Sequence, residues 1–231
     1  MRLAQTRRHF DQIDSTNTFA LNWPDAPDGV LVYADSQTQG RGRLGRHWVS
    51  PPGVGLYFSL VLRDLAPETK ARLSLLVGLA VAQAVEECAG ISVQIKWPND
   101  VLARDQKIGG ILCEATADRV VAGVGLNLNH SQQQLPDRPV FPASSLLLQT
   151  GRSFERDTVL DAIVAALEIQ LDSADWATQR AQIEDKLYGR GELVRAAGAM
   201  GLLQGIGDDG ALLVRTADGI KEVRSGEVEF L

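Results

Sequence analysis

Three arginines separated by glycines lie in one short segment, at Arg41, Arg43 and Arg46. The planar guanidinium of arginine makes paired hydrogen bonds to carboxylates and phosphates, and intervening glycines leave the backbone free to adapt. A loop of this kind can close on a strongly anionic ligand and exclude water from a reactive intermediate. The segment therefore predicts a site for carboxylates or phosphates, with a solvated basic loop as the alternative.

Residues 40–45 of the same segment also match the GxGxxG pattern of dinucleotide-binding folds. In those folds the glycines open a helix whose N-terminus binds the pyrophosphate. Here Pro51 and Pro52 follow closely, and paired prolines do not continue a helix. We therefore do not expect a dinucleotide-binding fold.

A further cation, Lys96, ends an alternating run that breaks at Trp97-Pro98. Because proline favours extended geometry in the residue before it, the lysine should lie on a rigid strand. Its compact ammonium could bring a carboxylate and a phosphate together, although a surface lysine is the alternative. Asn99 and Asp100 are ordinary turn formers, with a magnesium or nucleotide contact by Asp100 as the less favoured interpretation.

Glycines interrupt two other strand-like runs, at Gly109-Gly110 and within residues 123–129. A missing side chain inside a strand usually marks a bulge or the close approach of a ligand. Asn127 could then contact an adenine or a ribose, and an asparagine in a strand-end turn is the alternative.

The hydrophobic pattern predicts the elements that must position these residues. Short polar side chains at 14–17 should cap a short helix that Pro24 ends. Apolar, aromatic and β-branched runs predict strands at 29–36, 55–62, 93–97, 108–114 and 120–128.

Apolar residues at helical spacing predict helices from Pro67 to Gly90, from Thr158 onward, and from Trp176 to Leu187. Within the first of these, Gly78 is expected to permit a close approach. The pattern as a whole predicts an α+β fold, with a mixed, mainly antiparallel sheet and helices packed against it. Short apolar runs separated by Gly-Asp turns predict a small β-barrel over residues 189–231, after a larger domain of residues 1–188 that carries the candidate catalytic residues.

Composition excludes several classes of protein. The 231 residues are 45% hydrophobic and carry a net charge of −6, which gives no general basic field for nucleic acid. Cys88 and Cys113 lie in apolar runs without a metal-ligand pattern. The absence of a signal-like or membrane-spanning apolar run predicts a cytoplasmic protein without a membrane partner.

Five segments in this order resemble the catalytic domain of biotin protein ligases: DSTN (14–17), QTQGRGRLGRHW (37–48), KWPNDVL (96–102), KIGGILCE (107–114) and GVGLNLN (123–129). The terminal GEVEFL (226–231) more faintly resembles the end of the family's small barrel. The resemblance implies a fold like that of class II aminoacyl-tRNA synthetases, with an SH3-like C-terminal barrel. It also implies ATP-dependent formation of biotinyl-5'-AMP and transfer of biotin to a lysine of a biotin carboxyl carrier protein.

The resemblance also implies roles at matching positions. The implied biotin-binding residues are Ser15, Thr16, Asn17, Gln37, Arg41, Gly42, Arg43 and Lys96. The implied nucleotide-binding residues are Arg43, Arg46, Trp48, Lys96 and Asn127. Lys96 and Arg41 are the implied catalytic residues, and Mg²⁺ is expected to arrive with ATP rather than on protein ligands of its own.

Two alternatives accompany this hypothesis. A lipoate or octanoate ligase or transferase shares the fold, but those relatives typically carry a glycine triplet, which this sequence lacks. A non-catalytic regulator is the other class, and no DNA-binding helix-turn-helix is recognised. Because only thirteen residues precede Asp14, we expect the short form of the family without the N-terminal DNA-binding domain. The sequence leaves the choice between monomer and homodimer open.

Overall fold

The larger of two sheets carries the candidate site. In the computed structural model, which describes residues 2–137 and 141–231, this sheet has seven strands in the order β1-β2-β3-β7-β6-β5-β4. The strands are β1 (Arg7–Ile13), β2 (Leu31–Gln37), β3 (Gly55–Leu62), β4 (Gln94–Lys96), β5 (Asp100–Ala103), β6 (Gln106–Ala115) and β7 (Val120–Asn127). Only β1 and β2 pair in parallel among them, which confirms the mixed, mainly antiparallel sheet.

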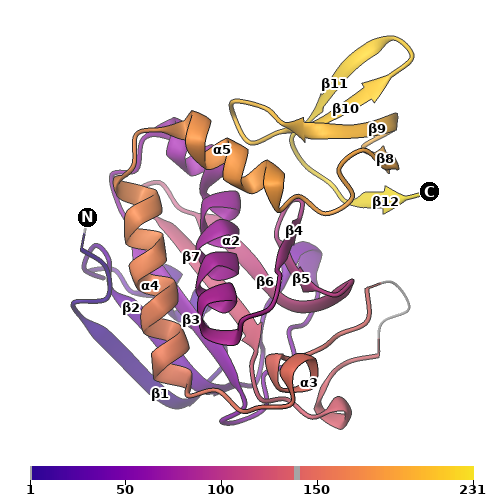
Figure 1. Ribbon diagram of the computed structural model, residues 1–231. Coiled ribbons are helices and arrows are strands. Elements are labelled where there is room, and N and C mark those ends of the chain that lie inside the picture. Colours follow the sequence, from indigo (N-terminus) through magenta and orange to yellow (C-terminus); the bar gives the residue numbers. More distant parts are fainter. Residues whose placement is uncertain (1, 138–140) are drawn as a thin grey trace.

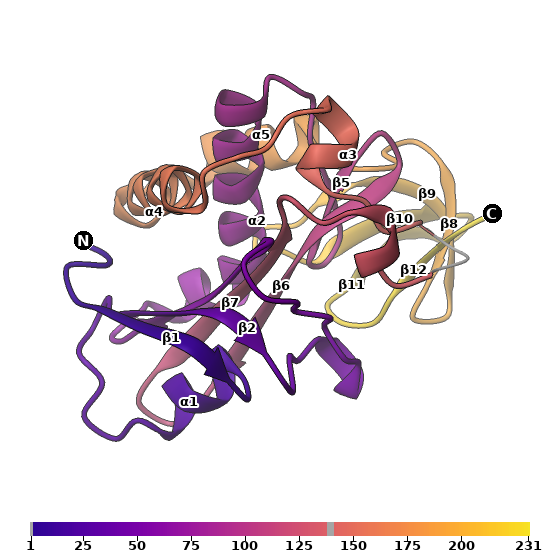
Figure 2. The ribbon, with the colours of Figure 1, turned by 90° about the horizontal axis from the view of Figure 1, so that it is seen from below.

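Helices cover both faces of this sheet. The long helices α2 (Pro67–Ala89) and α4 (Arg156–Asp172) lie side by side on one face, and α5 (Trp176–Asp185) crosses near one end of α2 (Figure 1). Figure 2 shows the short helix α1 (Thr16–Asn22) on the opposite face. The remaining helical turns are η1 (Arg43–Gly45), η2 (Gln132–Gln134) and α3 (Leu146–Thr150).

Helix α2 is buried more completely than its sequence predicts. Pro67 begins it and Gly90, with φ of 68°, ends it, as expected. The apolar face predicted for this helix is buried except for the half-buried Cys88, but Leu75, Leu79 and Ala82 on its other sides are buried too. A helix that packs against the sheet and also against α4 and α5 must be apolar around most of its circumference.

Helix α1 begins where the polar cluster at 14–17 predicts. Ser15 is its N-cap, and the hydroxyl accepts a hydrogen bond from the Thr18 amide at 3.4 Å. The helix ends at Asn22, just before Trp23 and Pro24. Its buried Ala20 packs with Val32, Val61 and other residues in a small core beneath the sheet. This anchoring fixes Thr16 and Asn17 at the start of the helix.

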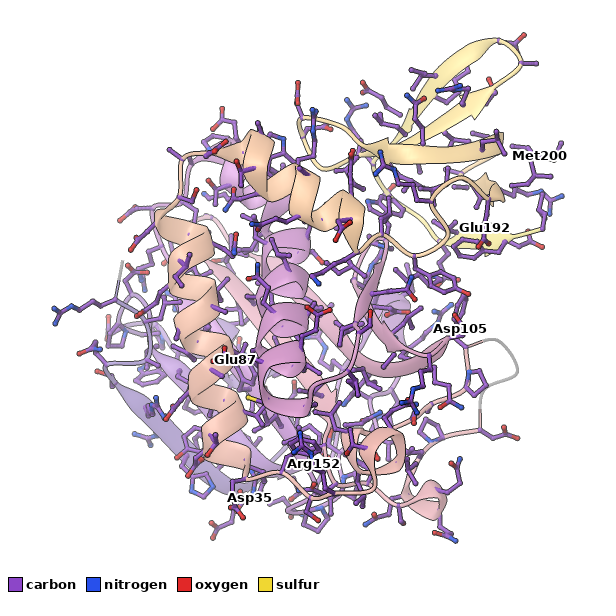
Figure 3. The ribbon with its side chains drawn as sticks, in the orientation of Figure 1. Asp35, Glu87, Asp105, Arg152, Glu192 and Met200 are labelled. Atoms are coloured by element: carbon purple, nitrogen blue, oxygen red, sulfur yellow. The ribbon has the colours of Figure 1, made fainter. Side chains whose placement is uncertain are left out.

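Two strands escaped the sequence analysis. The edge strand β1 is exposed along most of its length, so it lacks the alternation that marks a half-buried strand. Asp100 was expected only as a turn former, but residues 100–103 form β5, which reaches β6 through Arg104 and Asp105. Both turn residues have positive φ, and Figure 3 labels Asp105 at this tip.

A second sheet lies at the C-terminal end of the chain. Its strands are β8 (Leu193–Ala196), β9 (Ala199–Ile206), β10 (Leu212–Thr216), β11 (Gly219–Val223) and β12 (Val228–Phe230). They are antiparallel in the order β11-β10-β9-β8-β12, and Met200 lies at the outer end of this sheet (Figure 3). This confirms the small C-terminal β unit, while the boundary between residues 188 and 189 stays a prediction.

The small sheet is attached close to Lys96. The Tyr188 amide donates to the Ile95 carbonyl at 2.9 Å, and the Ile95 amide donates to the Lys186 carbonyl at 2.8 Å. The Trp97 indole donates to the Gly210 carbonyl at 3.1 Å. The strand that carries Lys96 is therefore hydrogen-bonded to the segment that enters the small sheet.

No helix among the described residues is both long and apolar enough to cross a membrane.

Gly78 does not support the close approach expected of it. A Cβ added there would lie 3.6 Å from Ile95 Cγ2, an ordinary van der Waals distance. Gly78→Ala should therefore raise the free energy of unfolding by about 0.5–1 kcal/mol, because alanine favours the helix and restricts the unfolded chain.

Urea unfolding followed by circular dichroism measures this difference. Gly189→Ala is the opposite control, because Gly189 has φ of 71° and its added Cβ would lie 2.0 Å from Phe230 Cε1. That variant should lose stability. A Gly78→Ala protein no more stable than the parent would contradict the interpretation.

Candidate active site

A cavity of about 790 Å³, including its open mouth, lies between the large sheet and the loop of residues 40–46 that carries the alternating glycines and arginines. Nine of the eleven residues with an implied role line it: Thr16, Asn17, Gln37, Arg41, Gly42, Arg43, Arg46, Trp48 and Lys96. They come from α1, β2, the loop and β4, which are separate in sequence. The fold therefore brings most of the predicted site residues to one place.

A network of hydrogen bonds forms one polar wall of the cavity. Gln37 Oε1 accepts from the Thr16 amide at 2.9 Å, and its Nε2 donates to Ser50 Oγ at 2.9 Å. Ser59 Oγ lies 2.8 Å from Thr16 Oγ1 and 2.5 Å from Asn17 Oδ1. Since Ser59 is fully buried, this network is rigid and fixes which polar atoms the wall offers.

Gly123 makes this wall possible. A Cβ at Gly123 would lie 2.0 Å from Asn17 Oδ1, so any other residue at position 123 would displace the Asn17 side chain. A glycine at this position of a strand was expected to mark a bulge or a ligand's approach. The structure shows instead that Gly123 accommodates a side chain from α1.

A pair of glycines accommodates Trp48 in the same way. Gly110 and Gly125 are opposite one another on β6 and β7. Added Cβ atoms would lie 3.2 Å and 2.5 Å from atoms of the Trp48 indole. The ring therefore packs over bare backbone, and Lys107 Nζ lies 5.5 Å from its centroid.

Each loop arginine is bound to an acceptor elsewhere in the chain. Arg41 makes a two-pronged ion pair with Glu114, at 2.7 and 3.0 Å. Arg43 donates to Asn99 Oδ1 at 3.1 Å and to the Gly226 carbonyl at 3.4 Å. Arg46 pairs with Glu227, which also lines the cavity. The loop is thus held over the cavity by both sheets.

Lys96 lies in this cluster with only 9% of its surface exposed. Burial lowers the pKa of its ammonium below the ordinary 10.5, because desolvation penalises the charged form. Asp100 and Glu227 raise this pKa, while Arg43 and Arg46 lower it further. Lys107 Nζ pairs with Asp100 at 2.5 Å, so the charges alternate across this side of the cavity.

Two residues with implied roles lie elsewhere. Ser15 is outside the lining of this cavity among the described residues, because its hydroxyl caps α1. Asn127 lines a neighbouring cavity of about 300 Å³, where its Nδ2 donates to the Ser144 carbonyl at 2.9 Å. Trp48 and Lys107 line both cavities, so Asn127 is adjacent to the site.

Four residues of the site were not predicted from the sequence: Ser59, Lys107, Glu114 and Glu227. Lys107 and Glu114 stand at the ends of the KIGGILCE segment, which was a usable signal. Glu227 belongs to the terminal segment, but nothing in its spacing links it to an arginine far away in sequence. Ser59 interrupts an apolar strand, and a buried hydroxyl needs a hydrogen-bond partner.

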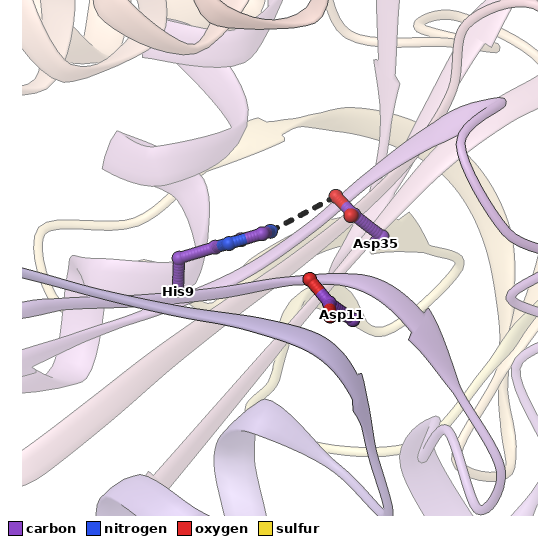
Figure 4. A group of neighbouring side chains, drawn as sticks. All are labelled: His9, Asp11 and Asp35. Atoms are coloured by element: carbon purple, nitrogen blue, oxygen red, sulfur yellow. Dashed lines mark ion pairs between the residues drawn. The ribbon is translucent and has the colours of Figure 1, made fainter.

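Outside this site, His9, Asp11 and Asp35 present ligand-type atoms within 4.8 Å of one another (Figure 4). His9 Nε2 lies 3.1 Å from Asp35 Oδ1, and Arg156 pairs with the same carboxylate at 2.8 Å. The charge of Asp35 is therefore already balanced by protein groups. We assign no metal to this cluster.

Residues 9–130 match the biotin/lipoate A/B protein ligase family, the class that the large sheet and its cationic cavity define. Residues 199–231 match the biotin protein ligase C-terminal domain. With both matches, the chain belongs to the biotin protein ligase family.

Individual relatives agree with this assignment. The chain is 37% identical to the bifunctional ligase/repressor BirA of Bacillus subtilis over 96% of this chain and 73% of that protein. It is 32% identical to the biotin–[acetyl-CoA-carboxylase] ligase of Paracoccus denitrificans, over 94% of this chain and 97% of that one. The solved biotin protein ligase from Aquifex aeolicus in complex with biotin and ATP has a TM-score of 0.86 at 33% identity, covering 98% of this chain and 99% of that chain.

The charges around Lys96 predict how its pKa responds to substitution. Glu227→Gln removes a carboxylate that raises this pKa, so the pKa should fall further and the ammonium should lose its proton at lower pH. An NMR titration of the labelled Lys96 side chain measures the shift. Glu222→Gln, on the exposed strand β11, is the matched control and should leave the pKa of Lys96 unchanged. An unchanged or higher pKa in Glu227→Gln would refute the prediction.

Proposed function

We propose that this chain joins biotin to ATP, forming biotinyl-5'-AMP and pyrophosphate, and then transfers the biotinyl group to a lysine of a biotin carboxyl carrier protein. The observation that carries the proposal is the gathering of Arg41, Arg43, Arg46 and Lys96 around one cavity. The relatives named above as biotin ligases, and the Aquifex structure with biotin and ATP, support it.

The first step brings together two groups of the same charge. A biotin carboxylate oxygen would form a bond to the α-phosphorus of ATP while the bond to the pyrophosphate leaving group breaks. Two anions a few ångströms apart repel strongly in a partly buried site. Arg41 and Lys96 would contact the carboxylate and the phosphate, offsetting this repulsion and fixing the line of attack.

The polar wall suits the other end of biotin. The ureido group offers two N–H donors and one carbonyl acceptor, and Thr16, Asn17 and Gln37 present both kinds of partner. Gly42 and Arg43 of the loop would close over the ligand. Ser15 would act indirectly, by capping α1 and so holding Thr16 in place. Apolar Phe58, Ile111, Leu112 and Val124 complete the lining around the rings and chain of biotin.

The nucleotide would occupy the side of the site toward the smaller cavity. Arg43, Arg46 and Lys96 would contact the phosphates, while Trp48 and Asn127 would border the adenosine. Mg²⁺ would enter with the triphosphate. The carboxylate of Asp100 lines the cavity and is a ligand type that magnesium prefers, but Lys107 already pairs with it. We therefore assign the metal to ATP and name no protein ligand.

In the second step the lysine amine of the acceptor would attack the acyl carbon, and AMP would leave. The acceptor is a carrier protein of the acetyl-CoA carboxylase type, by analogy with the Paracoccus ligase. We place the enzyme in the cytoplasm, where thiols stay reduced, in keeping with its free cysteines Cys88 and Cys113.

The polar wall also separates biotin from lipoate. The dithiolane ring of lipoate has no hydrogen-bond donor, so binding it there would leave buried polar atoms unpaired. Biotin-dependent exchange of pyrophosphate into ATP should therefore exceed lipoate-dependent exchange by at least about 10³-fold in kcat/KM. Equal exchange with both acids would favour the lipoate ligase alternative, and none with either would refute the proposed function.

Lys96→Ala tests whether the lysine acts in catalysis or only in binding. Removing its ammonium should lower kcat for adenylation by about 10²-fold or more, because the charge acts mainly in the transition state. The exchange assay measures kcat, and circular dichroism checks the fold. If only KM rises while kcat is unchanged, Lys96 contributes binding alone and the catalytic role is wrong.

A further inference from the structure

Glu114 joins two parts of the site that are far apart in sequence. It lies on β6, where its Oε1 accepts from Arg41 Nη2 at 2.7 Å and its Oε2 accepts from Arg41 Nη1 at 3.0 Å. Oε2 also accepts from Asn17 Nδ2 at 3.0 Å. Among the described residues, both partners line the cavity and Glu114 does not. The Glu114 carboxylate therefore contacts Arg41 and Asn17 on the side of these residues that faces away from the cavity.

The ion pair leaves Arg41 able to bind a second anion. A guanidinium has five N–H donors, and Glu114 uses one on each terminal nitrogen. The Nε–H of Arg41 and the second hydrogen on each of its terminal nitrogens can still donate hydrogen bonds to a ligand carboxylate or phosphate. Because the loop around Arg41 is rich in glycine, a fixed acceptor is needed to hold the guanidinium in one place.

The same carboxylate sets the orientation of the Asn17 amide. One Nδ2 hydrogen goes to Glu114 and the other to the Leu112 carbonyl, at 3.1 Å. With both donors directed to β6, Oδ1 is left beside Ser59 Oγ, 2.5 Å away. Only an acceptor at position 114 preserves this arrangement, since a donor there would oppose the amide N–H groups.

We propose that Glu114 is a positioning residue for the acid substrate, holding Arg41 of the loop and Asn17 of α1 in the arrangement that receives biotin. This inference rests on the proposed function and deepens it. The two oxygens of a carboxylate meet three N–H donors here, and the amide of glutamine supplies one oxygen and one opposing donor. Glu114→Gln therefore disrupts the arrangement with almost no change in shape.

Steady-state pyrophosphate exchange on the full chain tests the proposal. Glu114→Gln should raise the KM for biotin about tenfold, the size of a lost charge-assisted hydrogen bond, and change the KM for ATP less than about threefold. In an Arg41→Ala background the same substitution should raise the KM for biotin less than about threefold, because Glu114 acts largely through Arg41. Glu222→Gln is the matched control, being an exposed glutamate that also pairs with an arginine.

Several results would overturn the proposal. If Glu114 merely competes with the ligand for Arg41, Glu114→Gln lowers the KM for biotin. If Glu114 only supports the fold, both KM values change together, the melting temperature falls, and the effects of Glu114→Gln and Arg41→Ala multiply. Glu114→Asp keeps the charge on a shorter side chain, so it should raise the KM for biotin less than Glu114→Gln does. If Glu114→Gln fails to fold, Glu114→Asp becomes the test. A KM for biotin in Glu114→Asp equal to that of the parent then overturns the proposal.

The outcome is separable from that of the proposed function. An unsubstituted chain without biotin-dependent exchange removes both ideas. An active parent whose Glu114→Gln variant binds biotin equally well removes only this one.

Discussion

Repulsion between charges of the same sign governs this site in two ways. The proposed substrates, biotin and ATP, are both anionic and repel one another, and the clustered cations of the cavity repel one another as well. Arg43 and Arg46 both lower the pKa of Lys96, because nearby positive charges disfavour its protonated form. The protein offsets the repulsion among the cations with a partner for each loop arginine: Glu114, the Asn99 side chain with the Gly226 carbonyl, and Glu227. The cationic cluster is thus assembled on protein acceptors.

That requirement explains why the small C-terminal sheet is part of the site. Gly226 and Glu227 reach two of the loop arginines, and Trp97, directly after Lys96, donates to the Gly210 carbonyl. The segment that leads into the small sheet also pairs with Ile95. Lys96 therefore lies on an edge strand of the large sheet that is hydrogen-bonded to the C-terminal part of the chain, and the C-terminal unit contributes charge and position to the site.

Three glycines of strands β6 and β7 leave room for side chains that pack against the sheet. Gly123 makes room for Asn17, and the opposed pair Gly110 and Gly125 makes room for Trp48. Both side chains come from outside β6 and β7, and both lie directly against strand backbone. Such contacts need a strand without Cβ atoms at those positions, and β-sheet pairing still holds because the backbone hydrogen bonds are kept. The sequence signalled unusual strands here but not what fills them.

Features that depend on neighbouring residues could be predicted from the sequence, whereas contacts between residues far apart in sequence could not. The arginine-glycine segment, the cap at Ser15, the ends of α2 and most strands follow from residues within a few positions of one another, because capping and periodicity act over a turn or a strand. Strand β1 was missed because its exposed edge carries no alternation. Arg41 meets Glu114 across 73 residues, and Arg43 meets Gly226 across 183. Only folding brings such partners together, since which acceptor meets which guanidinium depends on sheet register and on packing between the two sheets.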